Sequence, residues 1–250
     1  MKRLLLGAAF VGMCGVFTII SSEMLHKEDH DNYEYEKQEF LCDLMVTNDV
    51  EMMENAFKRS FVESKDIICP YLFCMIRSKE MGDLFMRYGF DIRKESKSFL
   101  LHKGVSYNII TPVAIEYAAE RGADIELQDE TGKTVLAKQL HFCEHEFFVD
   151  NVKILLEYNA SVECVDHEKN TPLHILCKKR IHTSDFLSYC ACKNDMLKAA
   201  IYLVKCGADP CALNGHGLEP AELVDRRDIL KMYLETEAQG AKVMRFLNLE

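Results

Sequence analysis

The chain has 250 residues, of which 48% are hydrophobic, so it can bury a sizeable core and does not belong to the disordered class. Thirty basic residues against forty acidic ones leave a formal net charge of −10, which repels nucleic-acid phosphates unless a local basic patch overrides the average. The longest basic runs, from Lys178 to Arg180 and at Arg226 and Arg227, are too short for such a patch. We therefore expect no nucleic-acid partner.

The amino terminus differs from everything after it. Lys2 and Arg3 precede an uncharged stretch of 19 residues from Leu4 to Ser22, which is typical of an export signal and also long enough for an uncleaved membrane anchor. A buried core helix is the alternative. The sequence thus predicts a hydrophobic helix that serves as signal peptide or anchor over residues 1–22, with membrane association through residues 4–22. A charged linker at residues 23–37 follows.

Cysteine usage points in another direction. Eleven cysteines, ten of them beyond the predicted leader, are a hazard in an oxidising compartment unless they are paired. Either some pair after export, or the protein works in a reducing compartment, as a host cytoplasm would be for a secreted protein.

After the linker, the sequence predicts two pairs of helices that lack the helix-start motif found later in the chain. Apolar residues at 40, 41, 44, 45 and at 52, 53, 56, 57 predict two short amphipathic helices with a turn at Asn48 and Asp49. The next helices lie in "DIICPYLFCMIRSKEMGDLFMRYG". A further unit begins near Ser98 with "FLLHKG", and its second helix is expected to begin at Thr111 and Pro112.

A glycine or asparagine that ends an apolar helix and precedes an extended stretch recurs four times, at Gly89, Gly122, Asn159 and Gly207. These residues tolerate the left-handed conformation that follows a helix. The spacings are 33, 37 and 48 residues. We expect the extra residues in "HFCEHEFFVD" and in the insertion near residues 179–195 to form loops on one face.

The stretch "NTPLH" has the pattern of a helix start. Thr171 is expected to cap the helix, Pro172 to occupy its first turn and Leu173 to enter the core. A weaker copy, "DETGKTVLAK", places Asp129, Gly132, Thr134 and Leu136 in the corresponding positions, and a final copy, "NGHGLEPAELV", keeps Gly217 and Pro220.

Together with the 33-residue spacing, these motifs resemble the ankyrin-repeat family. The resemblance implies an all-α solenoid of stacked helix pairs with hairpin loops over residues 38–236, in about five units, followed by a cap and tail at 237–250. It also implies that His174 bonds neighbouring turn backbone. The repeat framework would then consist of Gly122, Gly132, Thr171, Pro172, Leu173, His174 and Gly207.

The function expected from this resemblance is protein–protein interaction without catalysis or a cofactor, as a scaffold or adaptor. Alternatives are a secreted effector that binds a host protein and an envelope protein that handles thiols or metals. Binding is expected at the hairpin tips, unless these are only solvated turns. The tip residues are Gln128, Asp129, Glu130, Asp166, His167, Glu168, Lys169, Asn214 and His216.

Two groups have metal-ligand residue types. The first is His141, Cys143, Glu144 and His145, but Phe142 stands where the zincin pattern needs glutamate, so a polar helix end is preferred. The second comprises Cys177, His182, Cys190 and Cys192, whose spacing matches no known metal signature. Zinc and a disulfide remain alternatives to ordinary cysteines there, and we predict no metal site.

Overall fold

The computed structural model describes residues 40–59, 70–93, 100–142, 146–179, 186–224 and 228–246. The predicted leader and linker lie outside these residues. All the regular elements in the described part are helices, which confirms the prediction of an all-α protein. Within the same residues no helix has the length and apolar character needed to cross a membrane.

Residues 40–47 form the first described helix, and the element bounds after it are as follows. The elements are α3 (Val50–Lys58), α5 (Pro70–Cys74), α6 (Lys79–Arg87), α8 (Leu100–Ser106), α9 (Pro112–Glu120), α10 (Val135–His141), α11 (Phe148–Glu157), α12 (Pro172–Lys178), α13 (Phe186–Lys205), the 3₁₀ turn η1 (Pro220–Leu223) and α14 (Ile229–Phe246).

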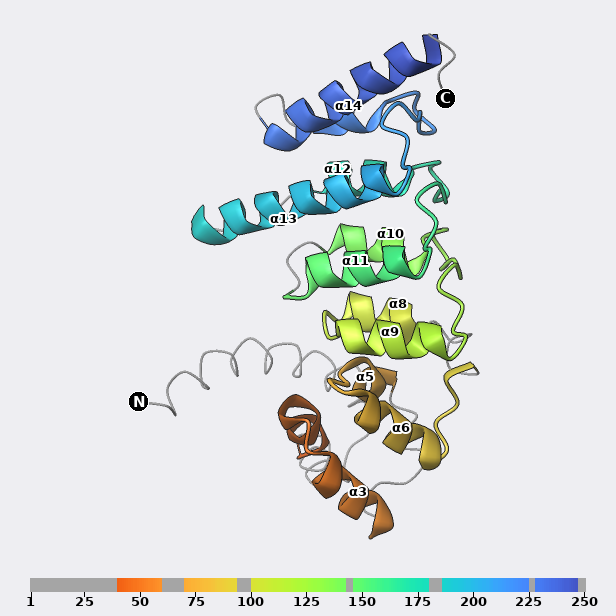
Figure 1. The fold of residues 1–250 in the computed structure, drawn as a ribbon, viewed down its shortest axis with the longest axis vertical. Coiled ribbons are helices and arrows are strands. Elements are labelled where there is room, and N and C mark those ends of the chain that lie inside the picture. The colour runs from red at the N-terminus through yellow and green to blue at the C-terminus, as the bar shows by residue number, and fades with distance from the viewer. Residues whose placement is uncertain are drawn as a thin grey trace, which may run out of the picture.

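The helices form an elongated stack of two rows (Figure 1). One row runs through α5, α8, α10, α12 and η1, and each of these elements contacts the next. The other row runs in the same way through α3, α6, α9, α11, α13 and α14. Loops that connect one helix pair to the next lie along one edge of the stack (Figure 1). The fold therefore depends on contacts between neighbouring units.

Threonine residues begin several of the helices. The Thr111 side chain caps α9 by accepting a hydrogen bond from the backbone N–H of Ala114, and Thr134 caps α10 in the same way through Ala137. In the early helix pair, Asn48 turns the chain with a φ of 54° and Asp49 caps α3. These starts lie where the sequence predicts them, because a cap is a local interaction.

The four helix-ending residues all adopt a left-handed conformation. Gly89, Gly122, Asn159 and Gly207 have φ angles of 98°, 80°, 61° and 96°. Glycine reaches this region without strain, and asparagine does so more readily than other side chains. Each chain reversal thus uses a residue suited to it.

The core lies between the two rows and continues through the stack. Tyr117, Phe73, Phe85 and Phe148 are among its largest fully buried side chains. The Tyr117 ring presses against Gly82 of α6, where an added Cβ would lie 2.6 Å from the ring. Glycine at this position lets α6 and α9 approach closely.

The residues that lengthen the 48-residue spacing do not all form a loop, contrary to the sequence prediction. Residues 186–195 belong to α13, which has 20 residues against 9 in α9 and 10 in α11. The run "FLSYCAC" has neither glycine nor proline, so extending the helix costs little once it has begun. The first half of α13 projects beyond its neighbours (Figure 1), and Leu187 is 75% exposed there.

The carboxyl end also differs from the predicted boundary. One helix, α14, runs from Ile229 through the expected junction at residues 236 and 237 to Phe246. The first element of the terminal pair is only the short 3₁₀ turn η1. Residues 237–246 therefore continue a helix of the stack, and residues 247–250 lie outside the described part.

A pair of helical glycines tests the packing. We expect Gly82→Ala to lower the free energy of unfolding by about 1–3 kcal/mol, because the new methyl group would overlap the Tyr117 ring. Gly240→Ala in α14 meets nothing within 4 Å, so it should raise stability by about 0.5–1 kcal/mol. Urea unfolding of the two variants checks this, and equal shifts would contradict the packing described for α6 and α9.

Candidate binding surface

Three loops along one edge have the same length and the same turn. Fourteen residues separate α9 from α10, α11 from α12, and α13 from η1. In each loop one residue donates its backbone N–H to the carbonyl oxygen four residues later. These pairs are Asp129 to Lys133 at 2.9 Å, Asp166 to Asn170 at 3.1 Å and Asn214 to Leu218 at 3.1 Å.

We call Asp129, Asp166 and Asn214 the turn residues. The side chain of each turn residue also accepts hydrogen bonds from backbone N–H groups of its own loop. The Oδ1 atom of Asp129 accepts hydrogen bonds from the backbone N–H groups of Thr131 and Lys133, at 2.9 and 3.1 Å. Asp166 and Asn214 accept the equivalent pairs from the second and fourth residues after them. Aspartate and asparagine favour such turns because their short side chains reach their own backbone.

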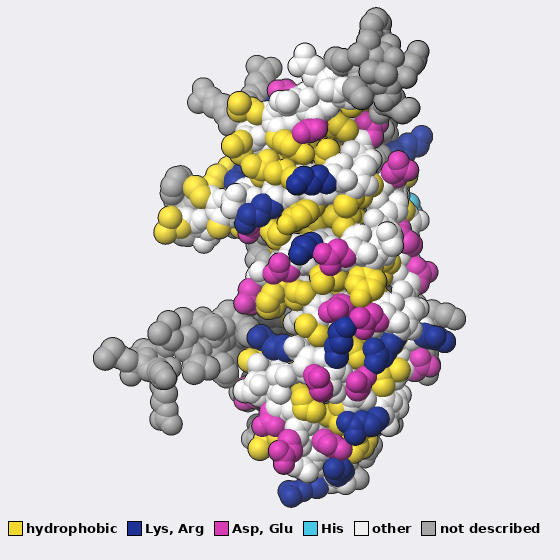
Figure 2. All heavy atoms as spheres, in the orientation of Figure 1, with side chains coloured by type: hydrophobic (Ala, Val, Ile, Leu, Met, Phe, Trp, Pro, Cys, Tyr) yellow, Lys and Arg dark blue, Asp and Glu magenta, His cyan; other side chains and the backbone are white. Residues whose placement is uncertain are grey.

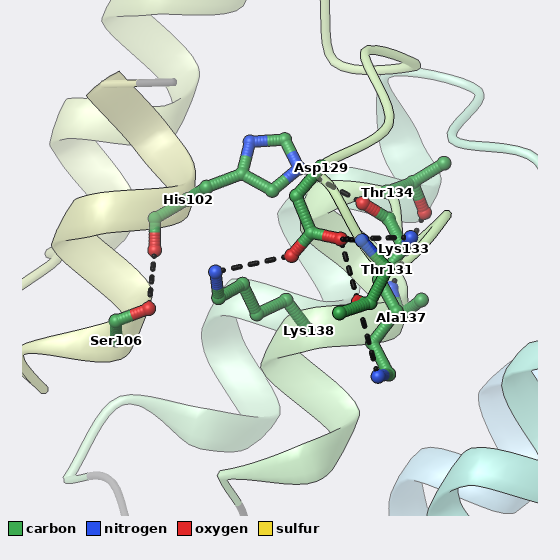
Figure 3. A network of polar contacts seen from close by, with 8 residues as sticks. All are labelled: His102, Ser106, Asp129, Thr131, Lys133, Thr134, Ala137 and Lys138. Atoms are coloured by element: carbon green, nitrogen blue, oxygen red, sulfur yellow. Dashed lines mark hydrogen bonds and ion pairs between the residues drawn. The ribbon is translucent and has the colours of Figure 1, made fainter. Parts of the chain in front are cut away.

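Asp129 makes two further contacts: the Thr131 hydroxyl donates to Oδ1 at 2.7 Å, and the Lys138 ammonium lies 3.2 Å from Oδ2 (Figure 3). Burial alone would raise the pKa of the Asp129 carboxyl. The hydrogen bonds from Thr131, Lys133 and Lys138 outweigh it and hold that pKa below its ordinary value. The Asp129 side chain is therefore ionised and accepts hydrogen bonds within its own loop.

The residue three positions after each turn residue has a positive φ. Gly132, Lys169 and Gly217 have φ angles of 78°, 59° and 73°. Gly132 is also crowded by the next loop, because an added Cβ would lie 2.7 Å from Cδ2 of His167. Glycine is thus required at position 132 for two independent reasons.

Hydrogen bonds join the loops to one another. The backbone N–H of His167 donates to the Thr131 carbonyl at 3.2 Å, and that of Gly215 donates to the Glu168 carbonyl at 2.9 Å. Each bond runs from the first residue after a turn residue to the second residue after the preceding one. The Asn214 amide adds a bond to Oδ1 of Asn170 at 3.0 Å. We call these three connected loops the loop ladder: residues 121–134, 158–171 and 206–219.

His174 ties α12 to the last loop of the ladder. Its Nδ1 atom accepts the backbone N–H of Thr171 at 3.2 Å and lies 2.8 Å from the Thr171 hydroxyl. Nε2 therefore carries the proton and donates to the Leu218 carbonyl at 2.9 Å. The side chain is fully buried, and burial lowers its pKa.

His102 occupies the same place two units earlier, which the sequence interpretation missed. Its Nε2 atom lies 3.0 Å from the Lys133 carbonyl, the counterpart of Leu218, and burial lowers its pKa as well. Figure 3 shows it beside the Asp129 turn. The available signal was Leu101 and His102 in "FLLHKG", which match Leu173 and His174 but lack the threonine and proline before them.

The predicted tip residues fall into two groups. Asp129, Asp166 and Asn214 hold the turns with their side chains, and the last two residues are only 8% and 7% exposed. The remaining six are exposed on the ladder: Gln128, Glu130, His167, Glu168, Lys169 and His216.

Two of these exposed side chains are engaged within the molecule. Gln128 donates to the Val165 carbonyl at 3.2 Å, and Glu168 pairs with the Lys178 ammonium at 2.6 Å. Glu130, His167, Lys169 and His216 are therefore the predicted tip residues best placed to meet a partner.

The candidate metal groups are only partly within the described residues. Residues 143–145 and 182 lie outside, whereas His141, Cys177, Cys190 and Cys192 lie inside. Cys177 is buried, which raises the pKa of its thiol, and Cys190 is exposed on the projecting half of α13. Among described residues no three histidine, cysteine, aspartate or glutamate side chains converge as a metal site would require.

Comparison with protein-family models finds no match to this chain, and comparison with curated proteins finds no similar sequence.

The two buried histidines predict a pH dependence. Because their pKa values are lowered in the folded state, the unfolded chain binds more protons once the pH falls below about 6.5, the ordinary histidine value. We expect the free energy of unfolding to decrease from pH 7.5 to pH 5, by up to about 1.4 kcal/mol per pH unit for each histidine. Urea titrations at several pH values measure it.

The matched variants are His102→Gln with His174→Gln, and His216→Gln at an exposed position. The double variant should be less stable at pH 7.5 and show a shallower decrease towards pH 5. His216→Gln leaves both buried histidines in place, so its slope should be steeper than that of the double variant. An unchanged slope in the double variant would show that other groups control the pH dependence.

Proposed function

We propose that this chain is an ankyrin-type repeat protein whose array acts as a non-enzymatic protein–protein interaction module. The loop ladder is the observation that supports the proposal. Three loops of equal length repeat one side-chain-supported turn at spacings of 37 and 48 residues, and the turns hydrogen-bond to each other. The stacked helix pairs behind them suit such an array.

Different residues of the ladder hold its backbone and form its exposed surface. Asp129, Asp166 and Asn214 hold the backbone, while neighbouring positions such as Glu130 and His216 point outward without supporting the turn. Outward positions can therefore take different side chains at little cost in stability. A rigid backbone also loses little conformational entropy when a partner binds.

The proposed setting is an exported or membrane-anchored protein, with residues 1–22 as the signal or anchor. Delivery as an effector into a reducing compartment is the form of this proposal that suits the cysteines in the core. Cys74 and Cys177 are buried as small apolar side chains.

Capture by cross-linking tests the proposal. The bait is the full chain, and the test variant carries Glu130→Ala, His167→Ala, Lys169→Ala and His216→Ala. We expect a partner captured by the natural chain to be reduced about tenfold or more, since contact side chains are lost while the turns remain. Quantitative mass spectrometry of the captured proteins gives the measurement.

A matched control removes the same charges from exposed helix positions: Lys153→Ala, Glu235→Ala, Thr236→Ala and Gln239→Ala. This control should capture the same partner as the natural chain. Undiminished capture by the test variant, with the control behaving alike, would place the binding surface elsewhere.

A further inference from the structure

Two exposed aliphatic side chains occupy the same position on neighbouring loops. The residue immediately before each turn residue is Gln128, Val165 or Leu213. Val165 is 42% exposed and Leu213 is 61% exposed. Their loops are joined by the bond from Gly215 to Glu168, so the two side chains are held in a fixed relation on one edge. We call Val165 and Leu213 the apolar pair.

Acidic side chains lie close in sequence to this position in the first two loops. The position two residues further back is Glu126 in the first loop and Glu163 in the second, and both are exposed. Glu126 accepts the backbone N–H of Ser161 at 2.9 Å, which orients its carboxylate towards the second loop. Acidic groups therefore lie two residues before Gln128 and Val165, whereas Cys211 has the equivalent position before Leu213.

The charge of the ladder is out of proportion to its length. Each of its three loops has two more acidic than basic residues, so 42 of the 250 residues hold −6 of the net charge of −10. Lys138 and Lys178 from the helices behind pair with Asp129 and Glu168. Within the described residues, no lysine or arginine forms an ion pair with Glu126, Glu130 or Glu163. Figure 2 shows acidic side chains along this edge.

We propose that the ladder binds a protein segment in which apolar side chains are flanked by lysine or arginine. The apolar side chains cover Val165 and Leu213, and the cations meet Glu126 and Glu163. This inference rests on the proposed binding function and specifies the chemistry of the partner. Burial of the apolar pair would provide affinity, and the negative charges of Glu126 and Glu163 would favour basic segments over acidic ones.

The probes are two fluorescein-labelled peptides. One has two central leucines with two lysines on each side, and the other has serines in place of the leucines. Fluorescence anisotropy measures their dissociation constants for the full natural chain and for Val165→Ser with Leu213→Ser. These four combinations form a double-mutant cycle between the peptide leucines and the apolar pair.

We expect the leucine peptide to bind the natural chain about tenfold more tightly than it binds the serine variant. Replacing the peptide leucines should cost a similar factor with the natural chain and almost nothing with the variant. Independent effects of the two changes, or no binding of the leucine peptide at millimolar protein, would overturn the proposal.

A second pair of variants tests the charges. Glu126→Gln with Glu163→Gln should weaken binding at 50 mM salt, and the difference should shrink at 500 mM because salt screens the carboxylates. Glu51→Gln with Glu80→Gln removes the same charge from exposed positions in α3 and α6 and should have a much smaller effect. Equal effects of both pairs would reduce the interaction to non-specific attraction and overturn the assignment.

The variant with Val165→Ser and Leu213→Ser also needs a control that removes apolar side chains elsewhere. Ile229→Ser with Met232→Ser removes side chains of α14 that are 59% and 65% exposed, and peptide binding should be unchanged.

The capture experiment of the proposed function distinguishes failure of this inference from failure of that function. If a partner is lost from the variant with the four alanine substitutions at the exposed tips but retained by Val165→Ser with Leu213→Ser, the result contradicts only the proposed role of the apolar pair. Retention by both variants contradicts the binding function of the ladder.

Discussion

The hydrogen bonds from backbone N–H groups to the side chains of Asp129, Asp166 and Asn214 are the interaction on which the rest of the structure depends. Each one fixes a reversal that would otherwise leave backbone donors unsatisfied. With the reversal fixed, its outward carbonyl faces the next loop and accepts a bond from it. A local interaction between residues four apart thus determines how units separated by 37 or 48 residues align.

The buried histidines connect the helices to the loops at equivalent positions. His102 and His174 both donate to the carbonyl of the fourth residue after a turn residue. In each case the donor lies on the first helix of one unit and the acceptor in the loop that leads to the next. The loops and helices of adjacent units are therefore positioned by one set of contacts.

Local signals in the sequence predicted much of this fold. The caps at Thr111 and Thr134 and the left-handed residues Gly122 and Gly207 depend on near neighbours, so their types identify them. Asp166 was harder to interpret. An aspartate in a polar loop has the same appearance in sequence whether it faces a partner or accepts backbone hydrogen bonds, and only Asp129 and Asn214 have a glycine three positions later to reveal the turn.

Longer-range features were less accessible. His102 lacks the threonine and proline that mark His174, so its role depends on where the Lys133 carbonyl lies in the fold. The apolar pair was missed because Val165 and Leu213 are ordinary core residues by type. The length of α13 was missed because a fixed period assigns surplus residues to a loop, whereas an uncharged run without glycine or proline can continue a helix.

The equal length of the three loops separates two kinds of change in the chain. The residues that lengthen the spacing from 37 to 48 all follow the first helix of the unit, on the side away from the ladder, and nearly all of them belong to α13, which has 20 residues against 10 in α11. Insertions there leave the alignment of the turns intact, while a single residue added between Gly122 and Thr134 would put every later hydrogen bond of that loop out of register. One edge of the molecule can thus diverge in length over evolution, and the other can change only by substitution.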